Sequence, residues 1–479
     1  MFTTQSSPFD AIVVGSGPNG LAAAITLARA GWSVQVREAR PTIGGGMRSA
    51  ELTLPGFVHD ICSAFHPLGL GSPFMRTLPL AEHGLQWVHP AAPLAHPFDD
   101  GTAALLERSF EETGATLGRD ARAYRRLMEP LATRWDTLGV DVLAPLRFPH
   151  NPFVMLDFGL RAVWPATWVA NTIFQDDHAR GLFAGMAAHS FLRLDELLTS
   201  AFGLMLGALG HAVGWPFARG GSQQIANALA SYLRNLGGEI VTDAPVETID
   251  ELPPARAIIF DVTPRQLLKI AGKRFTPGYA RSLENYRYGP GVFKVDFALD
   301  GPIPWKAPEV ARAGTVHVGG KLEQIAASER DAVQGRTSER PFVLVGQQSL
   351  FDPSRAPEGK QTVWAYCHVP NGSKVDMTER IEAQIERFAP GFKDRILAKH
   401  TFSAVTIQDY NANYIGGDIN GGVQDWRQLY TRPGLRIDPY TTPDKQIFIC
   451  SSSTPPGGGV HGMCGYFAAQ AALRTQDKK

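Results

Sequence analysis

The chain has 479 residues, of which 44% are hydrophobic, and it carries 46 basic and 46 acidic side chains. This is the composition of a globular protein, and because the formal net charge is zero we expect no nucleic-acid partner. None of the four cysteines has a close neighbour in the sequence, which argues against a disulfide framework, a zinc site and the cysteine pair of a disulfide reductase.

The first predicted element is a short apolar strand over residues 11–14. It leads into a turn with three spaced glycines, Gly15, Gly17 and Gly20, and then into a helix predicted over residues 19–30. The first glycine of such a turn allows a tight bend, the second lets backbone approach a phosphate, and the third lets helix and strand pack closely. Since a helix N-terminus also attracts anions, this unit predicts a site for the pyrophosphate of a dinucleotide.

A second predicted strand, residues 33–37, ends at Glu38. An acid about 20 residues after the glycines accepts hydrogen bonds from a ribose hydroxyl in dinucleotide sites. The following run, residues 43–49, contains glycines that allow backbone to approach a ligand, and Arg48, which can reach a phosphate. We therefore expect both segments to contact one dinucleotide.

Residues 101–215 have a different character, with helical patterns, prolines and large aromatic side chains. We expect a mainly helical unit whose interior contains most of these aromatics; the alternative for some is the wall of a pocket for an apolar substrate. The apolar stretch 201–217 is interrupted by glycines and is too short to span a bilayer, so we predict a buried helix, with monotopic membrane contact as the alternative. The aromatics are Phe148, Phe153, Trp164, Trp168, Phe174 and Phe183.

The pattern of a nucleotide-binding domain returns after residue 215. Ser222 is a plausible N-cap for a helix predicted over residues 223–236. Glycines end this helix, and short apolar runs follow it. These runs predict strands at 239–242, 246–249 and 257–263. Further along the chain, strands are predicted at 292–299 and 362–368, and a helix at 377–388.

The C-terminal segment repeats the opening arrangement. A strand predicted at 446–450 leads into the glycine-rich loop 451–465 and a helix at 466–473. A flavin ring that accepts a hydride at N5 gains negative charge at N1 and the C2 carbonyl, which a helix N-terminus stabilises. This favours a flavin dinucleotide, with His461 packed on the ring or hydrogen-bonded near it; the alternative is a structural loop histidine.

These motifs resemble the carotenoid/retinoid oxidoreductase family, the phytoene desaturase-related FAD enzymes within the amine-oxidase-like flavoproteins. The resemblance implies an α/β fold, with a Rossmann-like (GR2-type) FAD-binding domain and an interleaved α+β substrate domain. We place the discontinuous FAD-binding domain at 1–100, 216–285 and 428–479, and the substrate domain at 101–215 and 286–427. The matching segments are residues 14–21, 38–49, 214–222, 416–422 and 453–465.

The resemblance also implies where FAD, bound non-covalently, would contact the chain. Gly46 departs from the family pattern, because many relatives have arginine there, and we expect Arg48 to supply that charge. The implied cofactor-binding residues are Gly15, Gly17, Pro18, Asn19 and Gly20 at the pyrophosphate, Glu38 and Ala39 at the adenosine ribose, Gly45, Gly46, Met47 and Arg48 at the ribityl phosphate, Val246 at the adenine, and Gly459, Val460, His461, Gly462, Met463 and Cys464 along the ring.

The implied activity is hydride transfer between flavin N5 and the carbon framework of an apolar, isoprenoid or polyene-like substrate, as desaturation, saturation or isomerisation. One alternative is an oxidase of a small amine or other polar metabolite, which would need a compact aromatic cage at the flavin. Another is a redox-slow FAD-binding protein with a binding role. Both oxygen and a quinone stay open as the electron acceptor.

No metal cluster or Ser-His-Asp arrangement is visible in the sequence, so we expect no metal. His66, His189 and His461 are candidate acids or bases, although a single histidine is more often structural. Asp418 lies in a glycine-rich loop that the resemblance places near the substrate domain, and we expect His189 or Asp418 to face the cavity. Because the N-terminus lacks the features of a signal peptide, we expect a cytoplasmic protein, with peripheral membrane contact as an option.

Overall fold

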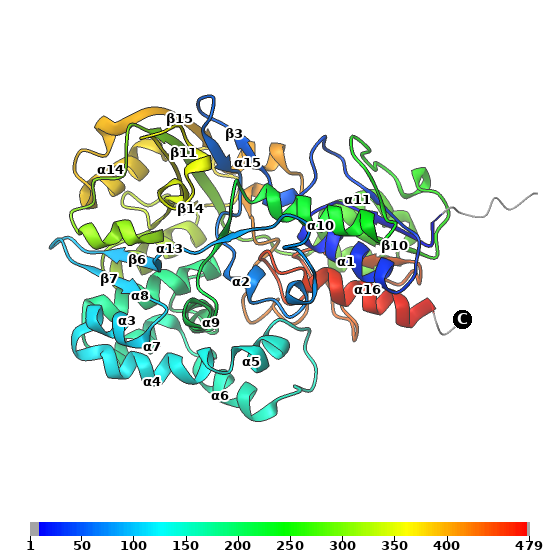
Figure 1. Ribbon diagram of the computed structural model, residues 1–479. Coiled ribbons are helices and arrows are strands. Elements are labelled where there is room, and N and C mark those ends of the chain that lie inside the picture. The colour runs from blue at the N-terminus through cyan, green and yellow to red at the C-terminus, as the bar shows by residue number, and fades with distance from the viewer. Residues whose placement is uncertain (1–8, 477–479) are drawn as a thin grey trace, which may run out of the picture.

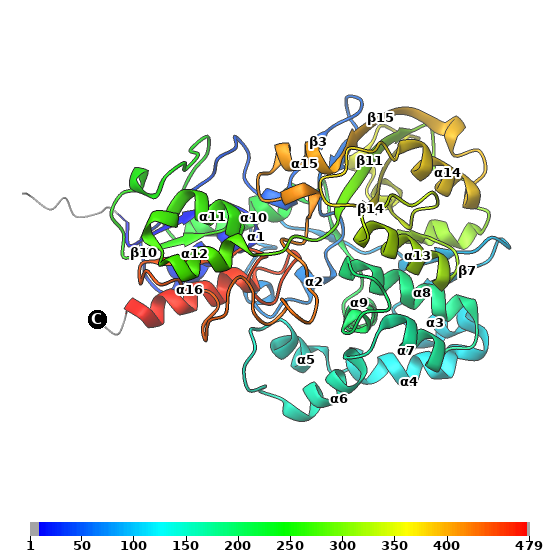
Figure 2. The same cartoon turned by 180° about the vertical axis from the view of Figure 1, so that it is seen from behind.

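The computed structural model describes residues 9–476. Figures 1 and 2 show three regions: a parallel sheet between helices, a larger mixed sheet, and a layer of helices below the larger sheet. The expectation about a signal peptide rests on residues that include 1–8, which lie outside the described part. Within residues 9–476, no helix is both long and apolar enough to cross a bilayer.

The first sheet has five parallel strands in the order β16-β10-β1-β2-β9. It combines chain segments from the beginning, middle and end of the sequence, which confirms the predicted Rossmann-like α/β domain. The strands are β1 (Ala11–Val14), β2 (Val34–Arg37), β9 (Glu239–Val241), β10 (Ala257–Phe260) and β16 (Ile447–Ile449).

Helices cover both faces of this sheet because its strands are apolar on both sides. Ala11 and Val13 belong to one core, whereas Ile12 and Val14 belong to another on the opposite face. The first core includes α1 (Pro18–Arg29), α10 (Gln223–Asn235) and α16 (Met463–Gln476), and the second includes α11 (Pro264–Ala271) and α12 (Pro277–Glu284).

The second sheet has seven strands in the order β15-β11-β14-β13-β12-β6-β7. All neighbours are antiparallel except β12 and β6. One face packs on α14 (Thr378–Phe388) in a separate core. The strands are β6 (Ala92–Pro97), β7 (Ala103–Leu106), β11 (Gly291–Leu299), β12 (Ala313–Val318), β13 (Val343–Gly346), β14 (Gln361–Val369) and β15 (Ile396–Phe402).

Strand pairing in this sheet contradicts one predicted domain boundary. A domain border at residue 100 would separate β6 from β7, whereas the two strands form a hairpin within the second sheet. The chain therefore enters the second sheet before residue 100, because the pairing of β6 with the distant β12 draws it there. The remaining division of the chain into two domains stays a prediction.

The helical layer contains most of residues 110–212. Helix α9 is largely buried, which agrees with the predicted buried helix over 201–217. The helices are α3 (Phe110–Leu117), α4 (Ala121–Ala132), α5 (Trp135–Val142), α6 (Pro152–Ala162), α7 (Ala166–Ile173), α8 (Asp177–Ala187) and α9 (Thr199–Ala212).

The expectation that the aromatics of this layer form its interior is correct only in part. Phe174 and Phe183 are buried, but Phe148 and Phe153 are each 85% exposed. Trp164 and Trp168 are also exposed and stack with their ring centroids 4.6 Å apart. These four aromatics lie on the outer surface around α6 and α7, so neither a core nor a pocket position applies to them.

One predicted strand is wrong. Residues 246–249 form a loop that ends in a short 3-10 turn, Ile249–Glu251, which Thr248 and Glu251 cap reciprocally. This side-chain capping competes with a sheet ladder for the backbone donors. The remaining short elements are β3 (Ser49–Glu51), β4 (Val58–Asp60), β5 (Trp87–Val88), β8 (Phe217–Ala218), α2 (Pro67–Leu70), α13 (Leu322–Val333) and α15 (Ala404–Tyr410).

Candidate functional site

A cavity of about 640 Å³ lies between the two sheets. One end is formed by loops that follow β1, β2 and β10, including residues 14–19, 37–40 and 261–263. The other end reaches Leu344 and Tyr366 of the second sheet. The carboxyl ends of parallel strands are where ligands bind in sheets of this type, and the cavity has the size of a ligand site.

Most of the predicted cofactor residues lie in the wall of this cavity. They come from three separated stretches of the chain, as the sequence led us to expect. The lining residues among them are Gly15, Gly17, Pro18, Asn19, Glu38, Ala39, Gly45, Gly46, Arg48, Val246, Gly459 and Val460.

The other predicted cofactor residues do not line the cavity. Gly20 lies beneath the turn, where a Cβ would be 2.1 Å from the carbonyl oxygen of Gly15. Gly20 therefore shapes the turn rather than touching a ligand. The other residues absent from the lining are Met47, His461, Gly462, Met463 and Cys464, which are buried.

Glu38 and Arg48 form a buried ion pair in the cavity wall, with Arg48 Nη2 2.9 Å from Glu38 Oε1. The backbone N–H of Ser16 donates to the other carboxylate oxygen at 3.1 Å, and the N–H of Arg40 donates to Oε1 at 2.9 Å. The sequence assigned the acid to a ribose and the base to a phosphate. In the structure, each charge neutralises the other and holds it at the cavity surface.

Asp261 is a cavity residue that sequence reasoning missed. The N–H of Gly20, at the start of α1, donates to its carboxylate at 2.9 Å. Burial raises the pKa of Asp261 to about 7 and the charge of Glu38 adds to this effect, whereas the N–H groups of Gly20 and Gly17 oppose it. Its position directly after β10 was the available signal, because β10 is the strand beside β1.

The floor of the cavity is one face of the second sheet. Thr315, Gly346 and Trp364 lie in one row across β12, β13 and β14, and Leu344 lies beside Tyr366 in the next row. Thr315, Leu344, Trp364 and Tyr366 line the cavity, and the rings of Trp364 and Tyr366 meet edge to face with centroids 4.8 Å apart. Side chains of alternate residues point to the same face, so this floor follows from the strand register.

The same rows continue onto β11 with a buried ion pair. Lys294 lies beside Tyr366 and Asp296 beside Trp364, and the Lys294 ammonium contacts the Asp296 carboxylate. Burial lowers the pKa of Lys294 and raises that of Asp296 to about 6. Neither residue lines the cavity, and the sequence gave no pattern that singled them out.

The candidate acids and bases have different positions. His189 and His66 line the cavity, and His66 Nε2 is 2.9 Å from Ser222 Oγ. Burial lowers the pKa of His189 to about 3 and that of His66 to about 4. Both rings are therefore neutral at physiological pH. Of the two residues expected to face the cavity, His189 lines it and Asp418 does not.

Asp418 and His461 stabilise loops instead. Asp418 is buried and accepts the backbone N–H groups of Gly289, Asn420 and Gly422 at 2.7–2.9 Å. His461 Nδ1 accepts the N–H of Met463 at 3.0 Å, at the first turn of α16. The imidazole of His461 thus accepts a hydrogen bond from a backbone N–H at the N-terminus of α16, as expected of a structural loop histidine. It does not line the cavity.

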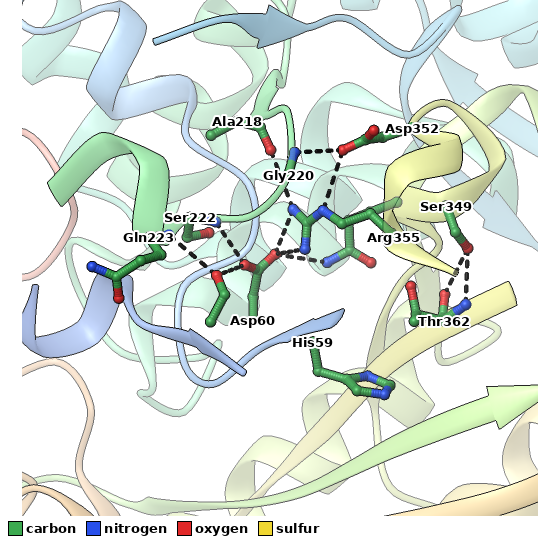
Figure 3. A network of polar contacts seen from close by, with 12 residues as sticks. His59, Asp60, Ala218, Gly220, Ser222, Gln223, Ser349, Asp352, Arg355 and Thr362 are labelled. Carbon is green, nitrogen blue, oxygen red and sulfur yellow. Dashed lines mark hydrogen bonds and ion pairs between the residues drawn. The ribbon is translucent and has the colours of Figure 1, made fainter. Parts of the chain in front are cut away.

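A buried charge network holds the elements behind the cavity together (Figure 3). Both terminal nitrogens of Arg355 lie 3.1 Å from Asp60 Oδ2, and its Nε lies 3.3 Å from Asp352. Asp60 also accepts the N–H of Ser222 at 2.7 Å, at the start of α10. The network joins β4, the N-terminus of α10 and the segment before β14, so it connects a helix that covers the first sheet with the chain that leads into the second. Within residues 9–476, no cluster of side chains could hold a metal ion.

Comparisons with known proteins agree with this geometry. Residues 13–77 match the family described as an NAD(P)-binding Rossmann-like domain. The chain is 24% identical to pyridine nucleotide-disulfide oxidoreductase domain-containing protein 2 of Mus musculus, over 97% of this chain and 93% of that protein. It is 25% identical to the neurosporene-forming phytoene desaturase of Rhodobacter capsulatus, over 95% and 92%.

A solved structure extends the likeness to amine oxidases. Putrescine oxidase bound to putrescine superposes with a TM-score of 0.62 at 20% identity, over 98% of both chains. This likeness shows the fold alone, and it confirms the predicted Rossmann-like domain with a second domain. Together these matches support the resemblance stated above: the chain is similar over most of its length to a phytoene desaturase, and it shares its fold with putrescine oxidase.

Proposed function

We propose that the protein binds FAD non-covalently and exchanges hydride between the flavin and the carbon framework of an apolar substrate, as desaturation, saturation or isomerisation. The observation that carries this proposal is the single cavity that runs from the glycine turn after β1 to the floor of the second sheet. A dinucleotide in the first part would bring its reactive ring toward the second. Oxygen or a quinone would serve as the electron acceptor.

The cavity walls fit such a cofactor. Glycines at positions 15, 17 and 45 leave room for a diphosphate, since a Cβ at Gly45 would lie 3.0 Å from the Cα of Gly17. Polar atoms of Asn19, Arg37 and Asn420, three residues of the cavity wall, are buried and have no partner within residues 9–476. Buried polar groups are nearly always paired, so these atoms support a polar ligand.

The chain's own contribution to the reaction is binding, orientation and exclusion of water. FAD, when bound, supplies hydride chemistry at N5. Phe65, Leu206, Trp215 and Leu344 surround the far part of the cavity with apolar surface, which excludes water and suits an apolar substrate. Holding the substrate in one orientation above the reactive ring supplies much of the rate enhancement in such enzymes.

The edge-to-face pair of Trp364 and Tyr366 gives some support to the alternative, an amine oxidase, because aromatic faces bind cations. The acidic residues that line the cavity among residues 9–476 are Glu38, Glu247 and Asp261. All three belong to the dinucleotide domain, so a cationic amine on the floor would find no carboxylate. This charge distribution favours the apolar substrate.

Purified protein tests the proposal directly. We expect it to be yellow, with flavin released by heat or acid, and to be reduced anaerobically by an apolar alkene or alkane of a substrate panel rather than by amines. Reoxidation by oxygen and by a quinone then identifies the acceptor. A colourless protein that cannot be reconstituted with FAD would exclude the cofactor, and a flavoprotein reduced by no substrate would support the alternative binding role.

FAD affinity is expected to fall as pH rises through about 7. Because the pKa of Asp261 is raised to about 7, the carboxyl is protonated below this pH and ionised above it. An ionised Asp261 repels the diphosphate at the same turn, so the Kd should rise up to about tenfold per pH unit above 7. Asp261→Asn should bind FAD more tightly at pH 8.5 and with no such pH dependence.

The same shift acts on the protein without cofactor. A raised pKa in the folded state means that its contribution to stability is complete below pH 3.8 and is lost as pH rises through about 7. Asp261→Asn should therefore raise the thermal midpoint at pH 8.5, while Asp250→Asn, a change at an exposed site, should not. The binding prediction is measured by fluorescence titration of FAD. A wild-type Kd for FAD that stays constant between pH 6 and 9 would contradict it.

For peripheral membrane contact, we propose the exposed apolar surface around α6 and α7. Trp164 and Trp168 stack on this surface, and tryptophan favours the boundary between lipid and water. A lipid surface is the proposed partner because it is also the phase in which an apolar substrate dissolves. Other exposed members of this surface are Leu146, Phe148, Phe153, Leu156 and Leu160.

The double variant Phe148→Ser, Phe153→Ser is expected to reduce binding to phosphatidylcholine vesicles at least about tenfold, since each buried phenyl group is worth about 1.5–3 kcal/mol. Leu435→Ser with Ile437→Ser is the matched control, because these two residues are equally exposed elsewhere. Vesicle flotation gives the bound fraction. If the first variant instead converts a dimer to a monomer, the surface binds a second copy and not a membrane.

A further inference from the structure

Two hydrogen-bonded histidines lie at the edge of the cavity floor. His189, in the 3-10 turn Ala188–Ser190, and His317, on β12, place their Nε2 atoms 3.1 Å apart. The ring of Trp215 meets both imidazoles edge-on, with centroids 5.8 and 5.9 Å away. At this distance one Nε2 donates a hydrogen and the other accepts it.

Both imidazoles are neutral. Burial lowers the pKa of His189 to about 3 and that of His317 well below its usual value. A charge on His368 lowers the pKa of His189 further, and charges on His189 and His96 lower that of His317. No carboxylate within residues 9–476 forms a hydrogen bond or ion pair with either ring, so nothing stabilises a second proton. Each ring therefore carries one N–H.

The surroundings of His317 determine which of its two ring nitrogens carries the proton. Its Nδ1 is fully buried and has no partner within residues 9–476. A proton there would leave a buried N–H without an acceptor, which is rarer in proteins than an unused acceptor. The proton of His317 thus lies on Nε2 and is donated to His189. Since His189 Nε2 accepts, the single proton of His189 lies on Nδ1.

The Nδ1 of His189 is the free donor of the pair. His189 lines the cavity and is only partly buried, and its Nδ1 has no hydrogen-bond partner in the described part of the chain. Two other residues of the cavity wall have unpaired polar atoms, Thr315 at Oγ1 and Trp364 at Nε1. Those two atoms are themselves buried, so the Nδ1–H of His189 is the uncharged donor that the floor presents beside its apolar surface.

We propose that the substrate is an apolar molecule with a carbonyl or hydroxyl oxygen, which accepts the Nδ1–H of His189, and that His317 is the positioning residue that fixes this tautomer. This inference rests on the function proposed above for the cavity. A plain hydrocarbon would leave the Nδ1–H of His189 unpaired, so the inference excludes a plain hydrocarbon as the preferred substrate. It also gives His189 the role of a neutral donor in place of an acid or base.

The tautomer is tested by nitrogen NMR of protein labelled with ¹⁵N-histidine, with His189 assigned by the signals lost in His189→Phe. We expect wild-type His189 to be protonated at Nδ1. His317→Phe should move His189 toward the Nε2–H form, whereas His317→Gln should preserve Nδ1–H, because its side-chain amide can donate to the same atom. A wild-type His189 protonated at Nε2 would overturn the inference, whether or not flavin is present.

Ligand binding to the flavin-loaded protein tests the substrate class. The probes are β-ionone, a ketone, and the analogue in which a methylene group replaces its carbonyl oxygen, both followed by flavin absorbance. We expect the ketone to bind about tenfold more tightly to the wild type, as for one hydrogen bond that is otherwise unpaired. This preference should disappear in His189→Phe, decrease in His317→Phe and persist in His317→Gln.

The outcomes separate the two proposals. Protein without flavin contradicts the proposed function, while the NMR result still decides the tautomer in that protein. Flavin-loaded protein that binds both probes equally, or neither of them, overturns the substrate class and leaves the cofactor assignment intact. A preference for the ketone that survives in His189→Phe shows that another donor, and not His189, is responsible, and this also overturns the inference.

Discussion

Gly20→Ala is expected to give a folded protein that no longer binds the proposed flavin. A Cβ at this position would lie 2.1 Å from the carbonyl oxygen of Gly15 and 3.0 Å from its carbonyl carbon. Both are backbone atoms, so no side-chain rotation can relieve the contact, and the turn itself must open. Opening the turn displaces the N–H groups of the loop from the diphosphate, and we expect FAD affinity to fall at least about a hundredfold.

Gly159→Ala is the matched control for this substitution. Gly159 also lies in a helix, α6, and a Cβ there would meet no atom within 4 Å. Alanine favours a helix over glycine at both sites, so circular dichroism should show unchanged helix content in both variants. The measurement is the ratio of flavin to protein absorbance after gel filtration. Full flavin content in Gly20→Ala would exclude this turn as the phosphate site.

Arg355→Met is expected to destabilise the protein by about 3–5 kcal/mol, since removing one partner of a buried ion pair leaves the other charge uncompensated. Here Asp60 would lose the guanidinium that pairs with it in the interior, and Asp352 would keep only its longer, 3.9 Å contact with Arg219. Burial alone would raise the pKa of Asp60, but Arg355 and the N–H of Ser222 lower it below its usual value. Arg355 thus keeps Asp60 ionised in the interior (Figure 3).

The free energy of unfolding, measured by urea denaturation at pH 7, checks this prediction. Arg125→Met is the control, because Arg125 pairs with Glu129 on the exposed side of α4 and such surface pairs add little to stability. We expect the control to denature almost as the wild type does. Because the pKa of Asp60 is lowered in the folded state, its contribution persists above pH 3.8 and is lost as pH falls further. Equal midpoints for the two variants would show that the network is not needed for stability.

The sequence predicted the local structure around the proposed dinucleotide site well, because each part of it is a continuous segment. The strand at 11–14, the glycine turn and the following helix all lie where the spacing placed them. Asp261 was missed for the opposite reason: its role depends on β10 lying beside β1, and these strands are more than 200 residues apart. Only the sheet order brings its carboxylate to the turn.

The floor of the cavity is hidden in the sequence for the same reason. Thr315, Leu344 and Trp364 become neighbours through strand register, which depends on pairing between separate segments. The exposed aromatics show a different limit. Hydrophobic side chains such as Phe153 predict burial when considered alone, and only the packed structure shows which face of a helix has no partner. His461 likewise required the loop geometry that turns its imidazole toward Met463.

The parallel sheet also has a consequence for the order in which the protein matures. Its first strands, β1 and β2, are synthesised early, whereas β16 and α16 come after the other strands and helices of the described chain. Until then, β10 has an open edge and α1 lacks the helix that covers it. Unpaired strand edges and exposed apolar surface favour aggregation, so the nascent chain is expected to depend on chaperones until α16 has been synthesised. Incorporation of the proposed flavin would then follow the synthesis of α16.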